Sequence, residues 1–516
     1  GDGTDSPELF IPSELDCRQW ARVLKESGFR MEILTAKHHD GFCLWQTETT
    51  EYSVKNSPWK DGKGDVVREM SEACAEFGLE FGVYISPWDR NAECYGDSPA
   101  YNEFYIRLIT ELLTNYGKIS EVWFDGACAE GPNGKVQVYD WKAIHAAIRE
   151  LQPQAVTAIM GNDVRWVGNE GGLGRKTEWS VNAFGPVSED GALEQREQLG
   201  LTEMSADMGS REIIAQAQQL YWYPSEVDVS IRPGWFYHAE QDSQVRSLNN
   251  LIDIYYQSVG RNSVLLLNIP PDRRGLLHEN DVERLHEFRS ALDEIFDRNL
   301  VEPLKKTWRA ENGASMTFKV NSDEMFGTFL ISEDISKGQR VESFTVEALK
   351  DGEWELIAEG TTIGYRRLLR FEKTQTEQIR TAITKGARAI LVNIVNTGSD
   401  DAAKGIISLA KEAGIPVIFF NREVSDEIVK SYDKCAFIGT DAAEAGKLQG
   451  DMIGDYAVKN FGSLDLNGDG ELSYVLFMGE KGNNEAIYRT KYSVENANKK
   501  LEEAAKKPLK FYDSAN

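Results

Sequence analysis

The sequence predicts an α/β fold that begins with a (β/α)8-type barrel, and two observations point to it. Between Leu15 and Phe296, short apolar stretches alternate with stretches whose apolar residues recur at helical spacing. No Gly-x-Gly-x-x-Gly motif follows the first apolar stretch, which counts against a dinucleotide-binding domain. The alternation alone also fits an open, doubly wound sheet. We assign residues 1–300 to this first domain.

The elements of this domain follow from local patterns. Short runs of apolar and β-forming residues predict strands at Arg30–Ala36, Leu79–Ile85, Glu121–Phe124, Ala155–Met160 and Val264–Asn268. Helical spacing predicts helices at Arg18–Ser27, Asp65–Phe77, Tyr101–Tyr116, Tyr139–Leu151 and Val282–Phe296. Pro153 lies just beyond the fourth of these helices, where a helix is expected to have ended.

The pattern changes at Val301, and residues 301–371 carry short stretches rich in β-forming residues. We expect strands at Met316–Val320, Thr328–Ile331, Ser343–Ala348 and Trp354–Ala358. Asp351-Gly352 between the last two is a hairpin-turn signal. Because sandwiches usually have about seven strands or more, this segment is expected to be an incomplete β-sandwich.

Residues 372–516 return to alternating strands and helices. We expect strands at Ala389–Val395, Pro416–Asn421, Ala436–Gly439 and Leu472–Met478. We expect helices at Thr376–Lys385, Ala402–Ala413, Glu444–Val458 and Ala486–Ala505. The pattern indicates a second α/β unit, doubly wound in type, that lacks an evident beginning and end.

Composition restricts the partners and the location. The 516 residues carry a net charge of −26, and such an acidic surface repels nucleic acid and anionic lipid. No run of about 18 apolar residues occurs, so no segment is expected to span a membrane. The six cysteines include no Cys-x-x-Cys pair and indicate neither a zinc site nor a disulfide scaffold. The chain starts at Gly1 without a signal peptide, so the sequence does not state its location.

The stretch Ser120–Cys128, SEVWFDGAC, organises the first domain. Three bulky apolar residues end a buried strand, and Asp125 follows them at its carboxyl end. Side chains in that position project into the crevice where α/β folds carry out chemistry. Asp125 is therefore either a catalytic carboxylate or a structural turn or N-cap residue, and the local pattern leaves both readings open.

Four further motifs place polar and aromatic side chains at strand ends and in loops. They are KHHDGFCLW at Lys37–Trp45, GVYISPWDR at Gly82–Arg90, DVRWVGNE at Asp163–Glu170 and YWYPSEVDVSIRPGWFYH at Tyr221–His238. Neutral imidazoles donate to and accept from hydroxyl groups, and aromatic faces suit sugar rings. The adjacent histidines could instead be metal ligands, but a third ligand is not evident from the sequence.

Together and in this order, these motifs resemble those of glycoside hydrolase family 29, the α-L-fucosidases, over about residues 1–371. Among the branches of this family, the sequence most resembles the one that acts on α-1,3 and α-1,4 fucosyl linkages. The resemblance implies a retaining enzyme that needs no metal or organic cofactor, with Asp125 as nucleophile and Glu170 as general acid/base. The candidate substrate contacts are His38, His39, Trp45, Tyr84, Trp88, Asp89, Arg232 and Trp235. A family strand and His-containing loop upstream of Gly1 are lacking, so we expect a truncated barrel.

The implied chemistry suits two carboxyl groups. Retaining hydrolysis needs them about 5–5.5 Å apart, one ionised and one protonated near neutral pH. Asp125 and Glu170 follow consecutive predicted strands, 45 positions apart (170 − 125). Glu226 is the alternative acid/base because it too lies in an aromatic stretch; otherwise it pairs with Arg232 or shapes the aglycone side.

Residues 373–516 resemble a different family, the periplasmic galactose/glucose-binding proteins. The stretches that carry this resemblance are IRTAITKGARAILVN, GIPVIFFNREVS, GTDAAEAGKLQGDMI and DLNGDGELSYVLFMGEKG. The resemblance implies galactose or glucose contacts at Asn393 and Arg489, with Asn483 at a family His and Glu485 at a family Asp. Asp465, Asn467, Asp469 and the carbonyl of Glu471 could form a weak, partial calcium site.

The two resemblances leave two functions open: hydrolysis of fucosylated glycans, and sugar binding within a transport or chemotaxis system. No Pro-, Gly- or Ser-rich linker separates them, and each stops inside a unit that should pack as a whole. We therefore hypothesise a chimera of two proteins joined near Phe371–Gln375. Both substrate classes imply a periplasmic, extracellular or cell-surface location.

Overall fold

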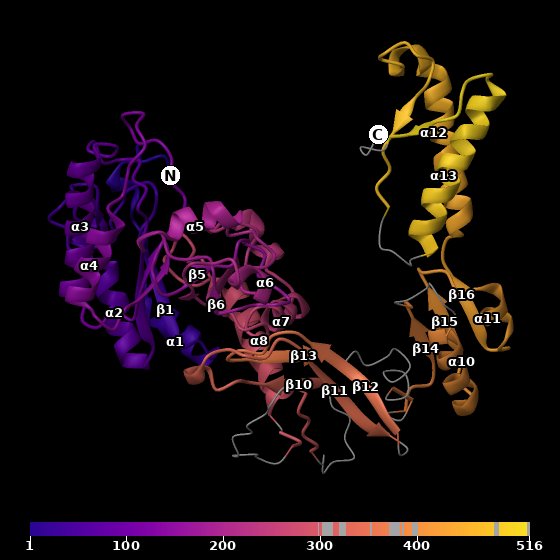
Figure 1. Ribbon diagram of the computed structural model, residues 1–516, viewed down its shortest axis with the longest axis horizontal. Coiled ribbons are helices and arrows are strands. Elements are labelled where there is room, and N and C mark those ends of the chain that lie inside the picture. Colours follow the sequence, from indigo (N-terminus) through magenta and orange to yellow (C-terminus); the bar gives the residue numbers. More distant parts are fainter. Residues whose placement is uncertain are drawn as a thin grey trace. The chain divides into compact units, whose positions relative to one another are not determined.

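A computed structural model describes residues 1–297, 299–301, 313–318, 327–350, 353–370, 382–383, 386–394, 401–478 and 484–512. The chain divides into two compact units, Gly1–Phe371 and Glu372–Asn516. We call them the first and the second unit and describe each by itself (Figure 1). The proposed junction at Phe371–Gln375 lies outside the described residues, so the chimera hypothesis stays a prediction.

Parallel strands form the centre of the first unit. One sheet has the order β1-β2-β3-β4, with β1 at Met31–Lys37, β2 at Glu80–Ile85, β3 at Glu121–Phe124 and β4 at Val156–Ile159. A second sheet has the order β5-β8-β9, with β5 at Arg165–Trp166, β8 at Ser225–Ser230 and β9 at Val264–Asn268. A parallel bridge between Ala158 and Val164 joins the two. All pairing in this wall is therefore parallel, as expected for a barrel.

Amphipathic helices cover the outer side of this wall (Figure 1). They are α1 at Cys17–Glu26, α2 at Val66–Phe77, α3 at Ser98–Asn115, α4 at Trp141–Leu151, α7 at Leu248–Gln257 and α8 at Glu279–Phe296. Side chains of Asp16, Asp65, Asp140 and Ser247 accept hydrogen bonds from first-turn amides and so define four of the helix starts. The helices predicted from spacing are present with shifted ends, whereas α7 was not predicted.

A long segment between β5 and β8 has its own small core. It contains the antiparallel pair β6 at Val181–Asn182 and β7 at Tyr221–Trp222, and the short helices α5 at Ala192–Leu199 and α6 at Arg211–Ile214. The buried residues that form this core are Ala183, Phe184, Leu201, Met208 and Tyr223. Short 3-10 helices lie at Pro7–Leu9, Val54–Asn56, Trp59–Gly62 and Ala239–Gln244.

Two-residue alternation along β3 decides what points into the barrel. The ring of Phe124 packs outward against Trp141 and His145 of α4, with centroids 5.6 and 5.9 Å away. The opposite face of the same strand carries Glu121 and Trp123, and the indole N–H of Trp123 donates to a carboxylate on β8. Asp125 continues this inward-facing series at the end of the strand.

The β-rich segment forms two antiparallel pairs: β10 at Thr328–Ile331 with β13 at Arg367–Arg370, and β11 at Phe344–Lys350 with β12 at Glu353–Gly360. It contacts the segment between β5 and β8, because Glu178 donates its backbone N–H to Thr362 at 3.0 Å and Ser180 donates to Gln339 at 2.7 Å. The predicted strand Met316–Val320 is wrong for residues 316–318, which form none; the rest of it, and Asp351-Gly352, lie outside the described residues.

The second unit has a parallel sheet in the order β14-β15-β16, with β14 at Ile390–Val392, β15 at Val417–Phe420 and β16 at Cys435–Ile438. Its other elements are α10 at Asp401–Ala413, α11 at Asp426–Lys430, α12 at Ala442–Leu464, α13 at Asn484–Glu503, β17 at Ser473–Tyr474 and β18 at Lys510–Phe511. The predicted strand Leu472–Met478 is thus only two residues long, because β18 pairs with no more of it. Most of the predicted helix Thr376–Lys385 lies outside the described residues.

Glycines set the contact between α12 and α13. Gly446, Gly450 and Gly454 recur every fourth residue, and a Cβ on any of them would come within 3 Å of α13 atoms. The two helices can therefore pack closely along this face. Even so, neither α12 nor any other described helix combines the length and apolarity needed to cross a bilayer.

Candidate active site

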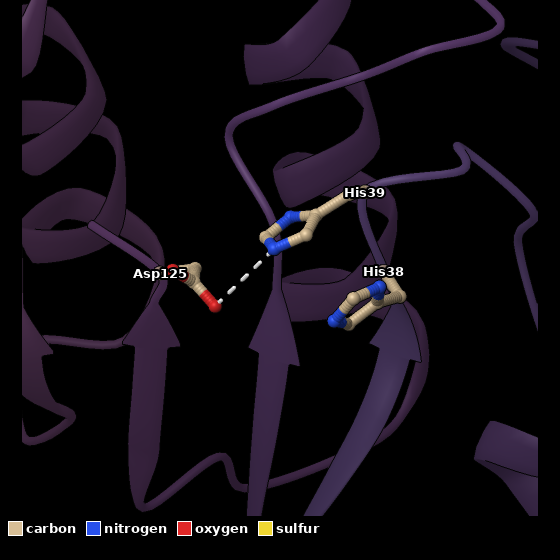
Figure 2. Close-up of side chains that lie close together, drawn as sticks. All are labelled: His38, His39 and Asp125. Atoms are coloured by element: carbon tan, nitrogen blue, oxygen red, sulfur yellow. Dashed lines mark ion pairs between the residues drawn. The ribbon is translucent and has the colours of Figure 1, made fainter. Parts of the chain in front are cut away.

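Asp125 lies at the carboxyl end of β3 (Figure 2), and both of its carboxylate oxygens accept hydrogen bonds. The Tyr84 hydroxyl donates to Oδ2 at 2.7 Å, and the backbone N–H of Ala127 donates to Oδ1 at 2.7 Å. His39 Nε2 lies 3.7 Å from Oδ2. The side chain still keeps 24% exposure, so it is oriented by the protein and open to a ligand.

His38 and His39 come from the loop after β1 and lie beside Asp125 (Figure 2). His39 Nδ1 is 2.6 Å from Ser86 Oγ, and the Ser86 hydroxyl donates to the carbonyl of Trp88. Because a carbonyl only accepts, that serine proton is used, and His39 must donate from Nδ1. Its Nε2 is then a hydrogen-bond acceptor that faces Asp125.

Aromatic rings line the same crevice. Tyr84 stacks on His38 with centroids 5.7 Å apart and on Trp123 at 5.1 Å. Phe236 meets His38 edge-on at 5.1 Å. Burial lowers the pKa of His38 to about 3, so this ring is neutral at physiological pH. Burial and the neighbouring Asp125 raise the pKa of Tyr84, so its hydroxyl remains a donor. The crevice thus offers apolar faces beside uncharged polar groups, as sugar recognition requires.

Glu226 lies below this crevice. It is 2% exposed, and its Oε1 accepts from Trp123 Nε1 at 2.6 Å. Glu226 and Glu121 face each other inside the barrel, and burial raises the pKa of both. At Glu121, repulsion from the charge of Glu226 raises the pKa further. In this position Glu226 holds the indole of Trp123, and the Trp123 ring in turn stacks on Tyr84.

Glu170 occupies an exposed loop position after β5. Its Oε2 accepts from the indole of Trp235 at 3.3 Å. Trp166 on the same segment donates from Nε1 to Asp228 Oδ1 at 2.8 Å. The strand β8 and the loop after it therefore fix both ends of the segment that carries Glu170.

The structure does not bring three of the predicted contacts to the crevice. Trp45 is fully buried and donates to Glu111 at 2.8 Å, so it belongs to the core. Arg232 is buried between Asp242 and Asp281, at 2.8 Å from each, and ties the loop after β8 to α8.

The third of these, Asp89, pairs with the buried Lys37 at 3.1 Å. This pair joins the end of β1 to the loop after β2. Gly41 approaches it with a φ of 89°, and a Cβ there would lie 2.4 Å from Asp89 Oδ1, which explains the glycine of the KHHDGF motif. Trp88 does reach the site: its ring lies 5.0 Å from that of His39.

Several residues of the site escaped sequence reasoning. Trp123 precedes Asp125 by two positions and therefore shares its face, a signal that strand periodicity could have given. Asp228 follows Glu226 by two positions in the alternating run EVDVS and therefore shares its face of β8. Ser86 and Phe236 lie within recognised motifs, but only the three-dimensional contacts reveal their roles.

The candidate residues of the second unit fall in separate elements. Asn393 follows β14, Glu485 and Arg489 lie one turn apart on α13, and Asn483 lies outside the described residues. In the loop after α12, Asp465 and Asp469 accept hydrogen bonds from nearby backbone amides.

The loop after α12 offers a poor fit to calcium. Lys507 and Lys510 pair with the Glu471 carboxylate at 3.0 and 3.3 Å and add positive charge beside the loop. Calcium takes about six to eight oxygens. Asp465, Asn467, Asp469 and Glu471 supply fewer oxygens than this at the predicted positions. Calcium binding at this loop stays a prediction.

Buried Asp228 should make stability depend on pH. Burial raises its pKa from 3.8 to about 6, so the folded state holds a proton that the unfolded state releases between these values. The free energy of unfolding should therefore fall by about 2–3 kcal/mol as pH rises through this window. Asp228→Asn keeps an acceptor for Trp166 and should remove this part of the pH dependence.

Tryptophan fluorescence isolates this effect, because all twelve tryptophans lie in the first unit. Urea unfolding would be followed between pH 4 and 7, with the exposed Asp5→Asn as the matched control. A pH dependence in Asp228→Asn equal to that of the parent would contradict the assignment.

Comparison with known proteins supports the first unit's identity. The family model for alpha-L-fucosidase matches residues 4–293. Alpha-L-fucosidase 1 of Arabidopsis thaliana is 42% identical over 403 residues, which cover 72% of this chain and 76% of that protein. A solved putative alpha-L-fucosidase from Bacteroides ovatus superposes with a TM-score of 0.71 at 59% identity. That match covers 72% of this chain, and the chain spans only 64% of the solved one.

The second unit has a different likeness. A periplasmic binding protein domain model matches residues 371–512. The D-galactose/methyl-galactoside binding periplasmic protein of Haemophilus influenzae is 36% identical over 151 residues, which cover 28% of this chain and 44% of that protein. The second unit is therefore similar to part of a periplasmic binding protein. Because the family match to the first unit covers more than half of the chain, the chain belongs to the alpha-L-fucosidase family of glycoside hydrolases, family 29, whose catalytic domain is a (β/α) barrel.

Proposed function

We propose that the first unit hydrolyses terminal α-1,3- or α-1,4-linked fucose from glycans with retention of configuration. One observation carries this proposal: Asp125 is held by Tyr84 and Ala127 at a strand end while 24% of its side chain stays exposed. A carboxylate in this state can attack the anomeric carbon. The family assignment supplies the sugar, and fucosylated glycans imply work outside the cytoplasm, in the periplasm or beyond the cell.

The reaction proceeds in two balanced steps. Asp125 Oδ2 bonds to the anomeric carbon as the bond to the aglycone oxygen breaks, and Glu170 gives its proton to that oxygen. Water then attacks the same carbon, Glu170 takes one of its protons, and the bond to Asp125 breaks. The enzyme returns to its starting protonation state.

The surrounding side chains have separable tasks. The hydroxyl of Tyr84 donates to Asp125 and so fixes the direction of attack. His39 Nε2 accepts a hydrogen bond from a sugar hydroxyl. The rings of His38 and Trp88 border the apolar face of the sugar. Trp235 holds Glu170 on the aglycone side. Neither step draws on a metal or an organic cofactor in this proposal.

Product stereochemistry tests the proposal directly. The purified chain would be incubated with an aryl α-L-fucoside, and the first-formed fucose would be observed by proton NMR before mutarotation. We expect the α anomer first, and faster release from α-1,3/1,4-fucosylated oligosaccharides than from an α-1,2-linked one. First release of the β anomer would contradict a two-carboxylate retaining mechanism.

A second candidate function is galactose or glucose binding by the second unit. It is favoured by the 36% identity to a galactose-binding protein, of which the match covers 44%. Calorimetric titration of the full chain with D-galactose, with and without calcium, tests it. Binding that Arg489→Ala removes would support this function, and no heat at millimolar sugar would exclude it.

A further inference from the structure

The side chains of His38, His39 and Asp125 converge on one point (Figure 2). One ligand atom from each lies within 4.8 Å of the others, and the separation of His39 Nε2 and Asp125 Oδ2 is 3.7 Å. In a tetrahedral zinc site with bonds of about 2.0–2.2 Å, neighbouring ligand atoms are about 3.3–3.6 Å apart. The separation of His39 and Asp125 is close to this value, and the pairs that involve His38 lie within 4.8 Å. The structure thereby supplies the third ligand that the sequence did not reveal.

The hydrogen bonds around His39 prepare it to bind a cation. Ser86 donates its proton to the Trp88 carbonyl and accepts one from His39 Nδ1, so the lone pair of Nε2 points at Asp125. Two acceptors then face each other at 3.7 Å with no proton between them. An imidazole held through its other nitrogen is the usual arrangement for a metal-binding histidine.

We propose that His38, His39 and Asp125 form a binding site for a borderline divalent cation such as Zn²⁺ or Cu²⁺. Two imidazoles and one carboxylate are the donor set of known three-ligand zinc sites, with a fourth position left for water. Mg²⁺ is excluded by the same set, since it prefers near-octahedral oxygen coordination. The chain's net charge of −26 attracts cations to its surface.

The cation acts as a competitive inhibitor, a consequence that rests on the proposed function. It engages Oδ2, the atom that must attack the sugar, and the His39 lone pair that accepts a sugar hydroxyl. Fucoside and cation therefore exclude each other. Chelation restores the free site, because no bond to the protein is permanently changed.

Direct binding tests the site without relying on activity. The full chain, freed of metal by chelator and dialysis, would be titrated calorimetrically with zinc chloride, and with magnesium chloride as the control cation. His38→Ala and Ser86→Ala should each weaken zinc binding about tenfold or more, the latter because it releases His39. His286→Ala, an exposed histidine on α8 that pairs with Glu26, is the matched control and should bind zinc as the parent does. Equal zinc affinity in the parent and in His38→Ala would overturn the proposal.

Kinetics then separates this inference from the proposed function. With an aryl α-L-fucoside, added zinc should raise the apparent KM while kcat stays constant. A fall in kcat at constant KM would place the inhibitory zinc elsewhere and overturn the inference. Zinc binding that His38→Ala abolishes, in a chain without fucosidase activity, would sustain the site and reject the function instead.

Discussion

Asp125→Asn should lower kcat on an aryl α-L-fucoside by about 10⁴-fold or more while leaving the fold intact. Asparagine has nearly the same shape, and its Oδ1 can still accept from the Ala127 N–H, while its Nδ2 can donate to the Tyr84 hydroxyl oxygen in place of the bond that Oδ2 accepts at 2.7 Å. It lacks the negative charge that attacks the anomeric carbon, and removal of a nucleophile typically costs this much. Initial rates, with far-UV circular dichroism to verify folding, measure the effect.

Chemical rescue sharpens this test. In Asp125→Ala the space of the carboxylate is free, and azide can attack the anomeric carbon in its place. Restored turnover with a fucosyl azide product would identify Asp125 as the nucleophile. Asp190→Asn, a 91% exposed acid paired with Lys142, is the control and should retain full activity. A loss below tenfold in Asp125→Asn would refute the assignment.

Glu170→Gln should slow hydrolysis of oligosaccharides by about 10²–10⁴-fold, yet spare substrates with activated leaving groups. A glycosidic sugar oxygen needs a proton to depart, whereas a dinitrophenolate does not. Glu170 lies exposed on its loop beside Trp235, where it can meet a leaving group. The ratio of rates for the two substrate types measures this proton transfer.

Glu226→Gln provides the opposing case. Its carboxylate is 2% exposed and bonded to Trp123, so it cannot reach the leaving group in this arrangement. We expect a smaller loss of about tenfold that is equal for both substrates, because Trp123 and then Tyr84 lose support. If Glu226→Gln instead showed the leaving-group dependence, Glu226 would be the acid/base and Glu170 a solvated loop residue.

Much of the fold could be predicted because barrel strands and helices carry strong local signals. β1 to β4 and β9 are short runs of β-forming residues, and α1 to α4 show helical spacing. The side chains of Asp16, Asp65 and Asp140 cap the starts of α1, α2 and α4. β8 was not predicted, because alternating acids and valines, EVDVS, are typical of a strand with one face in solvent and not of a strand buried on both faces. In the structure the acids face the barrel interior, an environment that no local pattern reports.

The candidate site, like the fold, could be predicted only in part. Asp125, His38 and His39 follow strands, and Tyr84 lies near the end of β2. Strand ends converge in any parallel barrel, so their proximity was predictable. Trp45 and Arg232 lie in motifs equally rich in aromatic and charged residues, yet the fold buries both. Whether a motif side chain faces the crevice or the core depends on contacts with distant segments, such as Glu111 for Trp45 and Asp281 for Arg232.

The serine below His39 has a consequence for how ligands are sorted. Because Ser86 commits the imidazole to an outward lone pair, the crevice distinguishes ligands by the direction of their hydrogen bonds. A hydroxyl fits as a donor, whereas a fluorine or a methyl ether at the same carbon brings only acceptors. Deoxyfluoro analogues of fucose, nearly equal in shape to the parent sugar, should therefore be rejected by polarity alone, whereas O-methyl analogues add the bulk of a methyl group to the same mismatch.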